Sequence, residues 1–164
     1  MDNLAKPKIF LDASMLVAAA LSDNVNSPGY MLFKMGEAGL IDLWISDQVL
    51  RETEGVLKGR LGTEDAAAVF LYLARNIDKA GAGNASEPHD ETVNACLPIT
   101  NYRPDAKVLA TALERDCEVL VTYDKQHLLN NPRIGPPNTR LVVMSAGEAV
   151  KWAKDQVITR ARLR

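Results

Sequence analysis

The sequence predicts an α/β protein in which a central parallel sheet is covered by helices on both faces. Two observations indicate this class: strand-like and helix-like segments alternate along the chain, and the strand-like segments are continuously apolar. Alternation with helices is typical of parallel sheets, and continuously apolar strands are typical of sheets buried on both faces. The chain has 164 residues, of which 47% are hydrophobic, and this is enough to build a core.

The first part of the chain is expected to contain one strand and two helices. The apolar run at residues 9–12 follows Pro7 and predicts a short strand, and the small residues at 13–21 predict a helix. The turn-forming stretch SDNVNSPG separates this helix from a second one at residues 30–37, which glycine ends.

The middle of the chain is expected to contain one strand and two further helices. Residues 41–46 form an apolar strand, and Ser46 or Asp47 is suited to capping a helix over residues 48–58. Glycines interrupt this helix, and a new one is predicted over residues 63–76, where acidic side chains in the first turn favour a helix start.

A long polar segment precedes the last helices and strands. Residues 78–103 are rich in turn-forming residues and predict a long connection with one short strand. The helix at residues 104–115 opens with proline, which is favoured in the first turn. Strands are then predicted at 118–122 and 140–145, with the stretch DKQHLL between them forming a turn and a short helix.

The end of the chain carries a helix-start pattern and a basic tail. Ser145 with Glu148 matches the capping box and predicts a terminal helix through residue 155. We therefore expect a single domain over residues 1–155 and a frayed basic tail over 156–164.

Composition and charge exclude several classes of protein. The net charge of −2 and the pI of about 5.7 do not fit a protein held on nucleic acid by bulk charge, so nucleic-acid contact would need a local basic patch or metal ions. Cys96 and Cys117 lack CxxC spacing and are expected to be reduced, buried thiols. No stretch fits a signal peptide or a membrane span, so we expect a cytoplasmic protein that does not enter membranes.

Two acidic residues follow predicted strands. Asp12 ends the strand at residues 9–12, and Asp124 follows the strand at 118–122 after one further residue. Each acid could serve only as a helix cap or turn residue. However, sites in open parallel sheets form beyond the carboxyl ends of the strands, so both acids are candidates for a shared site.

Two helices offer further carboxylates. Asp105 projects near the middle of the apolar stripe of its helix, so its charge needs a partner unless it only interacts with the helix dipole. Glu52 and Glu54 flank the apolar face of their helix on opposite sides, and periodicity does not choose between them. Either glutamate could be solvated, and Glu54 is placed to pair with Lys58 four residues later.

Carboxylates that gather in one place repel one another, and without a cation some of them take up protons instead. Two like charges 4 Å apart at an effective dielectric near 20 repel by about 4 kcal/mol. A ligand set made only of oxygen favours Mg²⁺ or Mn²⁺ over Zn²⁺. Such an ion lowers the pKa of bound water and neutralises phosphate, which is the chemistry of phosphodiester hydrolysis.

Four motifs occur together in an order and spacing that resemble the PIN domain family. They are FLDASML, ISDQVLRETEGVL, PDAKVLATALE and VLVTYDKQHLL, and the resemblance extends from about residue 8 to 150. The chain is similar to stand-alone members of the VapC-like toxin group. The resemblance implies a three-layer α/β/α sandwich around a parallel sheet and Mg²⁺-dependent cleavage of single-stranded RNA. It also implies four catalytic, metal-binding acids: Asp12, Glu52, Asp105 and Asp124.

The resemblance has supporting positions and one departure. Ser14 and Thr122 match small polar positions beside the first and last acids, where they would orient a ligand or water or form a local capping bond. Many family members carry a further acid at the position of Gln126, so a second ion site would be weak here. His127 is expected to be structural or solvent-exposed rather than catalytic, and residues 78–103 match nothing in the family pattern.

Basic residues beside the acids are candidates for substrate binding. Arg51, Lys58 and Lys125, together with Arg60, are expected to form a modest basic rim, or else to be ordinary surface charge. No glycine-rich phosphate loop and no GxSxG motif is present.

The sequence therefore predicts a metal-dependent endoribonuclease, a hydrolase that is one component of a type II toxin–antitoxin pair. Family resemblance implies an antitoxin protein that occludes the acidic pocket, and a homodimer. Two alternatives stay open: a phosphatase of the haloacid dehalogenase type, which would need a second aspartate where the chain has Ser14, and a non-catalytic binding module with the same fold.

Overall fold

The computed structural model describes residues 5–164, and within this range the chain forms five strands and seven helices. The strands are β1 (Lys8–Leu11), β2 (Asp42–Ser46), β3 (Gly83–Ala85), β4 (Val119–Val121) and β5 (Val142–Met144). The helices are α1 (Ala13–Ala20), α2 (Pro28–Glu37), α3 (Asp47–Leu61), α4 (Thr63–Lys79), α5 (Asp90–Thr100), α6 (Arg103–Glu114) and α7 (Ala146–Arg162).

All strands are parallel and follow the order β3-β2-β1-β4-β5. Strand β1 is central, and it pairs with β2 on one side and with β4 on the other. The chain therefore reverses its winding direction between β1 and β4, and a crevice opens at the carboxyl ends of strands at such a switch point. Because Leu11 pairs with Val121, the residues that follow β1 and β4 lie side by side at this edge.

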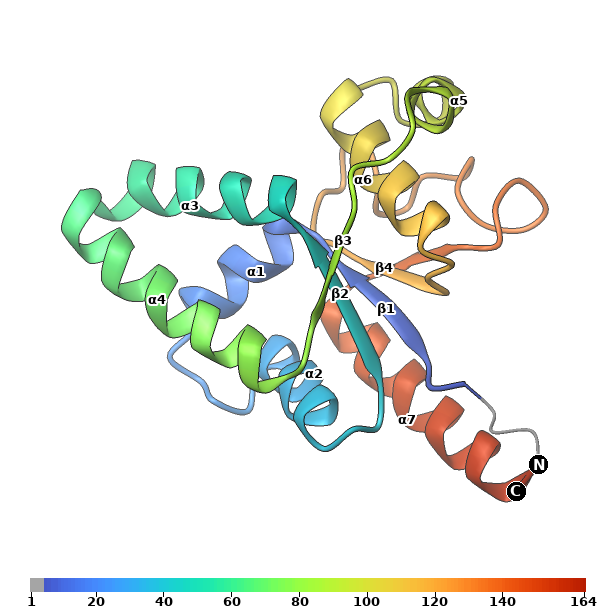
Figure 1. Ribbon diagram of the computed structural model, residues 1–164, viewed down its shortest axis with the longest axis horizontal. Coiled ribbons are helices and arrows are strands. Elements are labelled where there is room, and N and C mark those ends of the chain that lie inside the picture. The colour runs from blue at the N-terminus through green and yellow to red at the C-terminus, as the bar shows by residue number, and fades with distance from the viewer. Residues whose placement is uncertain (1–4) are drawn as a thin grey trace.

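The sheet is the middle layer of a three-layer α/β/α sandwich, as predicted. Figure 1 shows α5 and α6 on one side of the sheet and α1, α2 and α7 on the other. Cover on both faces explains why β4 is apolar throughout and why β1 is apolar after Lys8. Ile9, Phe10, Leu11, Leu120 and Val121 have no exposed surface, and burying a side chain of this size contributes roughly 1.5–3 kcal/mol to stability.

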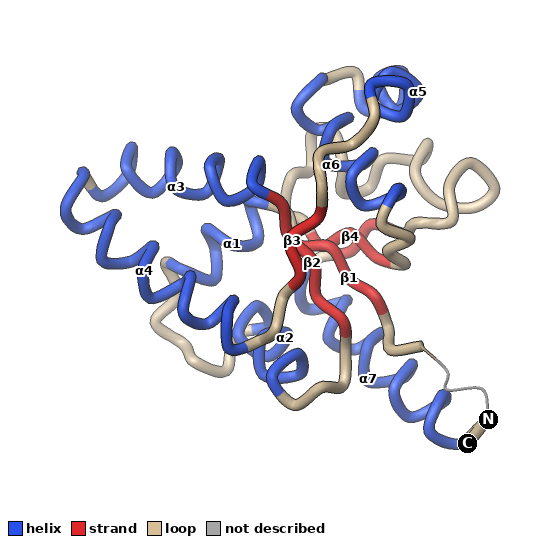
Figure 2. Tube along the Cα trace, viewed as in Figure 1, coloured by secondary structure: helices blue, strands red, loops and turns tan. Residues whose placement is uncertain are grey.

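Helices α3 and α4 form an antiparallel pair that extends away from the sheet (Figure 2). Only the start of α3 is next to the carboxyl end of β2, where Ser46 caps the helix by accepting a hydrogen bond from the Val49 amide. The far part of the pair packs on α1 through a small separate cluster formed by Val17, Leu57 and Ala66. One end of α3 is therefore fixed at the sheet edge and the other rests on α1.

The segment 78–103 differs from its prediction as a long connection. It contains the expected short strand, β3, but also helix α5, which the sequence pattern did not predict. Helix α5 carries Pro98 in its interior and ends at Asn101 in the left-handed conformation, so the usual signals of a continuous helix are weak. The helix forms because Val93 and Cys96 bury against the core beside α6.

The C-terminal part of the chain also differs from its prediction. Helix α7 does not end at residue 155 but continues to Arg162, and Arg160 holds this extension by donating to Glu118 and to the backbone carbonyl of Ala5. The stretch DKQHLL forms turns and contains no helix. The other predicted helices and strands are present, with ends shifted by a few residues.

Both cysteines are free and buried, as expected, and burial raises the pKa of Cys96 to about 11 and that of Cys117 to about 12. Such thiols remain protonated and unreactive at neutral pH. Among residues 5–164, no helix combines the length and the apolar character that crossing a membrane requires. The N-terminal stretch considered for a signal peptide includes residues 1–4, which lie outside the described residues.

Candidate active site

The switch point between β1 and β4 brings two acids together. Asp12 directly follows β1, and Asp124 follows β4 after Thr122 and Tyr123. Strand spacing in a sheet is about 4.8 Å, so the residues at these two strand ends are neighbours. The sheet itself therefore brings together two carboxylates that are more than 100 positions apart in the sequence.

The carboxylate of Asp12 is held by hydroxyl groups instead of capping a helix. Its side chain is 5% exposed and makes no capping hydrogen bond to α1. Oδ2 of Asp12 accepts hydrogen bonds from Thr122 Oγ1 at 2.7 Å and from Ser14 Oγ at 3.0 Å. Burial raises the pKa of Asp12, and these two hydrogen bonds act in the opposite direction by favouring the charged form.

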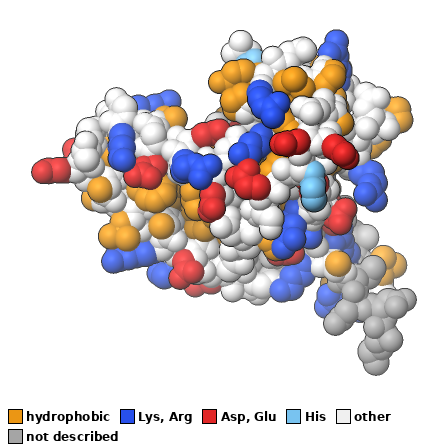
Figure 3. All heavy atoms as spheres, turned by 45° about the horizontal axis from the view of Figure 1, so that its top comes forward, with side chains coloured by type: hydrophobic (Ala, Val, Ile, Leu, Met, Phe, Trp, Pro, Cys, Tyr) orange, Lys and Arg blue, Asp and Glu red, His pale blue; other side chains and the backbone are white. Residues whose placement is uncertain are grey.

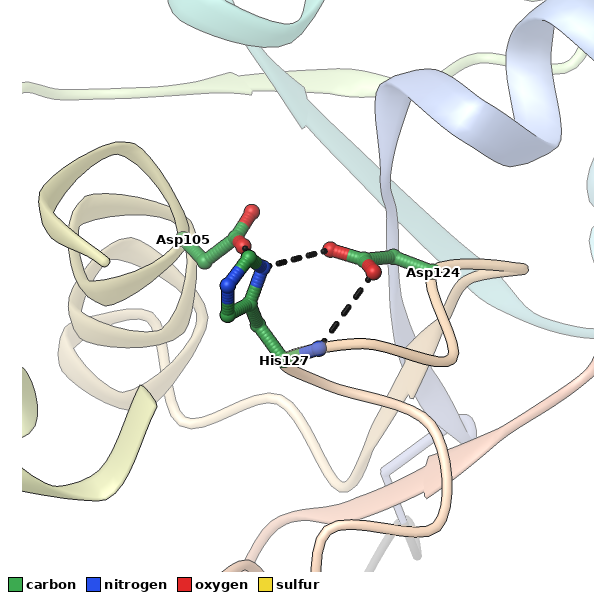
Figure 4. A group of neighbouring side chains, drawn as sticks. All are labelled: Asp105, Asp124 and His127. Atoms are coloured by element: carbon green, nitrogen blue, oxygen red, sulfur yellow. Dashed lines mark hydrogen bonds and ion pairs between the residues drawn. The ribbon is translucent and has the colours of Figure 1, made fainter. Parts of the chain in front are cut away.

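Asp105 lies in the first turn of α6 and faces Asp124 (Figure 4). Burial, followed by the nearby charge of Asp124, raises the pKa of Asp105 from 3.8 to about 8. Oδ2 of Asp105 is fully buried and accepts no directed hydrogen bond from the described residues. A buried oxygen of this kind is costly unless a cation or donor occupies the position in front of it.

His127 lies between these two acids. Its Nδ1 atom is 2.9 Å from Oδ2 of Asp105 and 3.6 Å from Oδ2 of Asp124 (Figure 4). The first distance is a close contact without hydrogen-bond geometry, and Oδ2 of Asp105 therefore has no hydrogen-bond partner among the described residues. The other oxygen of Asp124 accepts the backbone N–H groups of Gln126 and His127, which fixes the turn after β4. The ring of Tyr102 stacks on the imidazole with a centroid distance of 4.9 Å and an interplanar angle of 18°.

Glu52 reaches the same region from α3. The amide of Gln48, one helical turn earlier, donates to Oε1 of Glu52 at 2.9 Å and to the carbonyl of Pro104 at 2.9 Å. Gln48 therefore ties α3 to the start of α6 and orients Glu52 at the same time. Burial raises the pKa of Glu52, and the charge of Asp12 adds to this effect. Glu54 lies on the surface in an ion pair with Lys58.

All four carboxylates line one open cavity of about 830 Å³. The other lining residues are Ala13, Ser14, Val17, Ala18, Gly55, Val56, Arg60, Tyr102, Pro104 and Tyr123. The acids occupy one part of the cavity, and apolar residues of α1 and α3 extend it. Residues from four separate motifs of the sequence thus meet at one place.

The PIN domain family model matches residues 8–126, which include all four motifs' acids. The chain belongs to the PIN domain family. PIN domains are in general nucleases that use divalent metal ions. A comparison with the curated proteins found no match.

Solved structures show the same fold as this PIN domain. PAE2754 from Pyrobaculum aerophilum is 20% identical with a TM-score of 0.62, and the match covers 90% of this chain and 96% of that one. VapC20 from Mycobacterium tuberculosis, a toxin that cleaves the sarcin-ricin loop, is 14% identical with a TM-score of 0.51. That match covers 71% of this chain and 89% of VapC20.

The residues of this PIN domain fit a divalent cation. Asp105, Asp124 and His127 each present one possible ligand atom, and these atoms lie within 4.8 Å of one another. Asp12 and Glu52 line the same cavity without belonging to that tight group. Carboxylate oxygens are the ligands that Mg²⁺ and Mn²⁺ prefer, and the buried Oδ2 of Asp105 provides an oxygen with no donor of its own.

The candidate substrate-binding residues do not gather around the cavity. Arg51 and Lys58 do not line it, and Lys58 is paired with Glu54. Lys125 lines a second cavity of about 410 Å³ that also includes His127 and Arg133. On the face shown in Figure 3, Lys and Arg side chains are interspersed with Asp and Glu and do not form one basic field. Arg60 is the basic residue among those lining the acidic cavity.

The sequence did not predict the contacts that Gln48 and Tyr102 make at this PIN site. Gln48 and Glu52 are four residues apart on one helix, and this spacing was an available signal for their contact. Tyr102 lies in a segment without periodicity, and nothing in the sequence links it to His127. The sequence predicts that His127 is structural or solvent-exposed rather than catalytic; its side chain is 23% exposed and contacts Asp105 and Asp124, and its role stays a prediction.

Proposed function

We propose that this PIN domain is a metal-dependent endoribonuclease that hydrolyses phosphodiester bonds of single-stranded RNA. The observation that carries the proposal is that four carboxylates from distant motifs line one cavity. Without a cation these groups repel one another, and the pKa values of Asp12, Glu52 and Asp105 are raised mainly by burial and further by this repulsion. A binding module without catalysis has no need for such an arrangement.

Asp12, Glu52, Asp105 and Asp124 would hold the ion, Mg²⁺ or Mn²⁺, with Glu52 acting directly or through water. When bound, such an ion lowers the pKa of a water molecule and neutralises charge on the phosphate. The protein residues contribute position: Thr122 and Ser14 orient the carboxylate of Asp12, and Gln48 orients Glu52. This support from neighbouring side chains would hold the two carboxylates in place in the absence of substrate.

We further propose that the protein is the toxin component of a type II toxin–antitoxin pair and acts in the cytoplasm as a homodimer. The resemblance to VapC-like toxins supports this role, and VapC20 shares the fold. An antitoxin segment that fills the cavity would cover the carboxylates. The apolar side chains of Val17, Ala18 and Val56, which line the cavity beside the acids, suit the side chains of such a peptide.

The decisive experiment combines metal binding with RNA cleavage. The wild-type protein, Asp12→Asn and the matched control Glu54→Gln are incubated with a single-stranded RNA of mixed sequence, with Mg²⁺ and with EDTA. We expect cleavage by the wild type and by Glu54→Gln in Mg²⁺, no cleavage in EDTA, and a loss of at least roughly 100-fold for Asp12→Asn. Cleavage that is indifferent to both EDTA and Asp12→Asn rejects the mechanism.

Thermal unfolding with and without Mg²⁺ separates the remaining alternatives. A metal-binding nuclease is stabilised by the ion, because a ligand that binds only the folded state raises the melting temperature. A non-catalytic module would show neither cleavage nor this shift. Formation of a phosphoenzyme from a phosphomonoester would instead support the haloacid dehalogenase type, although Ser14 stands where that chemistry needs a second aspartate.

A further inference from the structure

Two exposed tyrosines line the acidic cavity. The sequence contains four tyrosines, and of these Tyr102 and Tyr123 line the cavity together with the carboxylates. Tyr102 is 48% exposed and Tyr123 is 39% exposed. Tyr30 is buried, and Tyr72 is exposed on α4 without lining the cavity. Large aromatic rings left open beside a polar site are a feature that folding alone does not require.

Tyr102 is held in place on one side and open on the other. One face of its ring stacks on His127, which itself contacts Asp105 and Asp124. Its backbone is fixed by Thr100, whose hydroxyl donates to the carbonyl of Tyr102 at 3.0 Å. The ring is therefore a rigid surface attached to the acid cluster, and nearly half of the residue remains accessible to a planar ligand.

Tyr123 is attached to the acids through the backbone. It immediately precedes Asp124, and its amide donates to Oγ of Ser14 at 2.9 Å. Ser14 in turn donates to Asp12. The same hydroxyl network that orients the first acid thus fixes the backbone of Tyr123 beside the carboxylates.

We infer that Tyr102 and Tyr123 form a nucleobase-stacking subsite for single-stranded RNA next to the catalytic carboxylates. This inference rests on the proposed ribonuclease function. The net charge is −2, the cavity lining includes four acids and the basic residue Arg60, and so phosphate attraction alone is a weak source of affinity. Stacking on aromatic rings supplies affinity without positive charge and accepts any base, because every base has a π-face.

Stacking also explains a preference for single strands. In a duplex the base faces are covered by their neighbours, whereas an unpaired strand exposes them to flat side chains. The subsite therefore selects unstructured RNA with little discrimination among bases at the stacked positions. If an antitoxin segment or a second copy of the chain covers these rings instead, the leucine variants will bind RNA as tightly as the parent protein.

The test measures binding in a protein that does not cleave. Fluorescence anisotropy of a labelled 12-nucleotide RNA is recorded with Mg²⁺ for full-length Asp12→Asn, and for the same protein carrying Tyr102→Leu or Tyr123→Leu. Each leucine variant is expected to weaken binding by roughly 5- to 150-fold, whereas Tyr102→Phe and Tyr123→Phe keep the parent affinity. The matched control is Tyr72→Leu, which removes a similarly exposed tyrosine that does not line the cavity and is expected to leave RNA affinity unchanged.

An abasic oligonucleotide of the same length is the second arm, and it is expected to compete poorly because it offers phosphates without bases. Equal binding by both leucine variants, or equal competition by the abasic strand, overturns the stacking subsite. If the wild type cleaves RNA while both leucine variants bind RNA normally, the stacking subsite is rejected and the proposed ribonuclease function stands. If the wild type neither binds nor cleaves RNA, the proposed function fails as well.

Discussion

The Nδ1 atom of His127 lies 2.9 Å from Oδ2 of Asp105, in the region where the carboxylates of this PIN domain converge. The neighbouring Gln126 occupies the position at which many family members carry an additional acid. The chain therefore has an imidazole nitrogen, and one fewer carboxylate, beside the candidate metal ligands. Imidazole suits transition metals better than it suits Mg²⁺, and this difference leads to a first prediction.

His127→Ala is expected to lower the affinity for Mn²⁺ by roughly 10-fold and to change the affinity for Mg²⁺ much less. The reason is that the substitution removes a nitrogen donor and leaves every carboxylate in place. Isothermal titration with each ion measures both affinities. His89→Ala is the control, because the ring of His89 is exposed and pairs with Glu114 outside the cavity lining. Equal losses for the two ions would show that the ring acts only through packing.

The pH dependence of the metal-free protein follows from Asp105. Its pKa is about 8 in the folded protein and 3.8 ordinarily, so the folded state holds a proton that the unfolded state releases between these values. The free energy of unfolding therefore falls as pH rises from about 4 to 8, by up to about 1.4 kcal/mol per pH unit from this group. Urea unfolding across this range, compared with Asp105→Asn, isolates the contribution.

The variant Asp105→Asn is expected to gain stability relative to the wild type as pH rises through this window, since its side chain has no proton to lose. Adding Mg²⁺ at high pH is expected to remove most of the difference, because the ion favours the charged carboxylate. A stability difference that is independent of pH would show that Asp105 keeps its ordinary pKa in the folded protein.

Thr122→Val tests the hydrogen bonds that orient Asp12. The substitution keeps the shape of the side chain but removes the 2.7 Å hydrogen bond to the buried carboxylate, which is expected to cost roughly 1–3 kcal/mol and to weaken metal binding. Chemical denaturation and metal titration provide the two measurements. Thr111→Val is the control: its buried hydroxyl bonds to the Lys107 carbonyl, so it is expected to lose stability without losing metal affinity.

Gly36→Ala tests the packing of α2 against the end of α4. A Cβ atom at this position would lie 2.8 Å from the Ala80 carbonyl oxygen and 2.9 Å from Leu43, so we expect a loss of roughly 1–3 kcal/mol. Gly59→Ala is the matched control within a helix, where a Cβ atom meets no neighbour within 4 Å. It is expected to stabilise the protein by roughly 0.5–1 kcal/mol through helix propensity, and both values are measured by urea unfolding. If Gly36→Ala were as stable as the wild type, α2 and α4 would have room to separate.

The sequence predicted the sheet, and the edge of the sheet at which the site lies, because the signals involved are local. Apolar runs such as residues 9–12 predict strands by themselves, and the position of Asp105 on an apolar helical stripe predicted its burial. The apolar periodicity of α3 did not decide whether Glu52 or Glu54 faces the site, because that depends on how α3 is oriented relative to the sheet. Family resemblance favoured Glu52, which is the glutamate that lines the cavity.

Long-range packing explains the features that were missed. Helix α5 contains Pro98, and it is stable through its contact with α6 rather than through its own propensity. The contact between Tyr102 and His127 joins two irregular segments, which carry no periodic pattern. Sequence patterns record which face of an element is buried, but they do not record which loops meet.

The matched register of β1 and β4 has a consequence for how the protein responds to its ion. Because these strands hold Asp12 and the turn before Asp124 together, the apolar core overcomes the repulsion between acids each time the chain folds. In the metal-free protein the folded state therefore includes repulsion between neighbouring carboxylates. A cation removes this repulsion when it binds, and it finds the ligands already assembled. Chelation and mild denaturant should therefore act in the same direction, each making the other more effective.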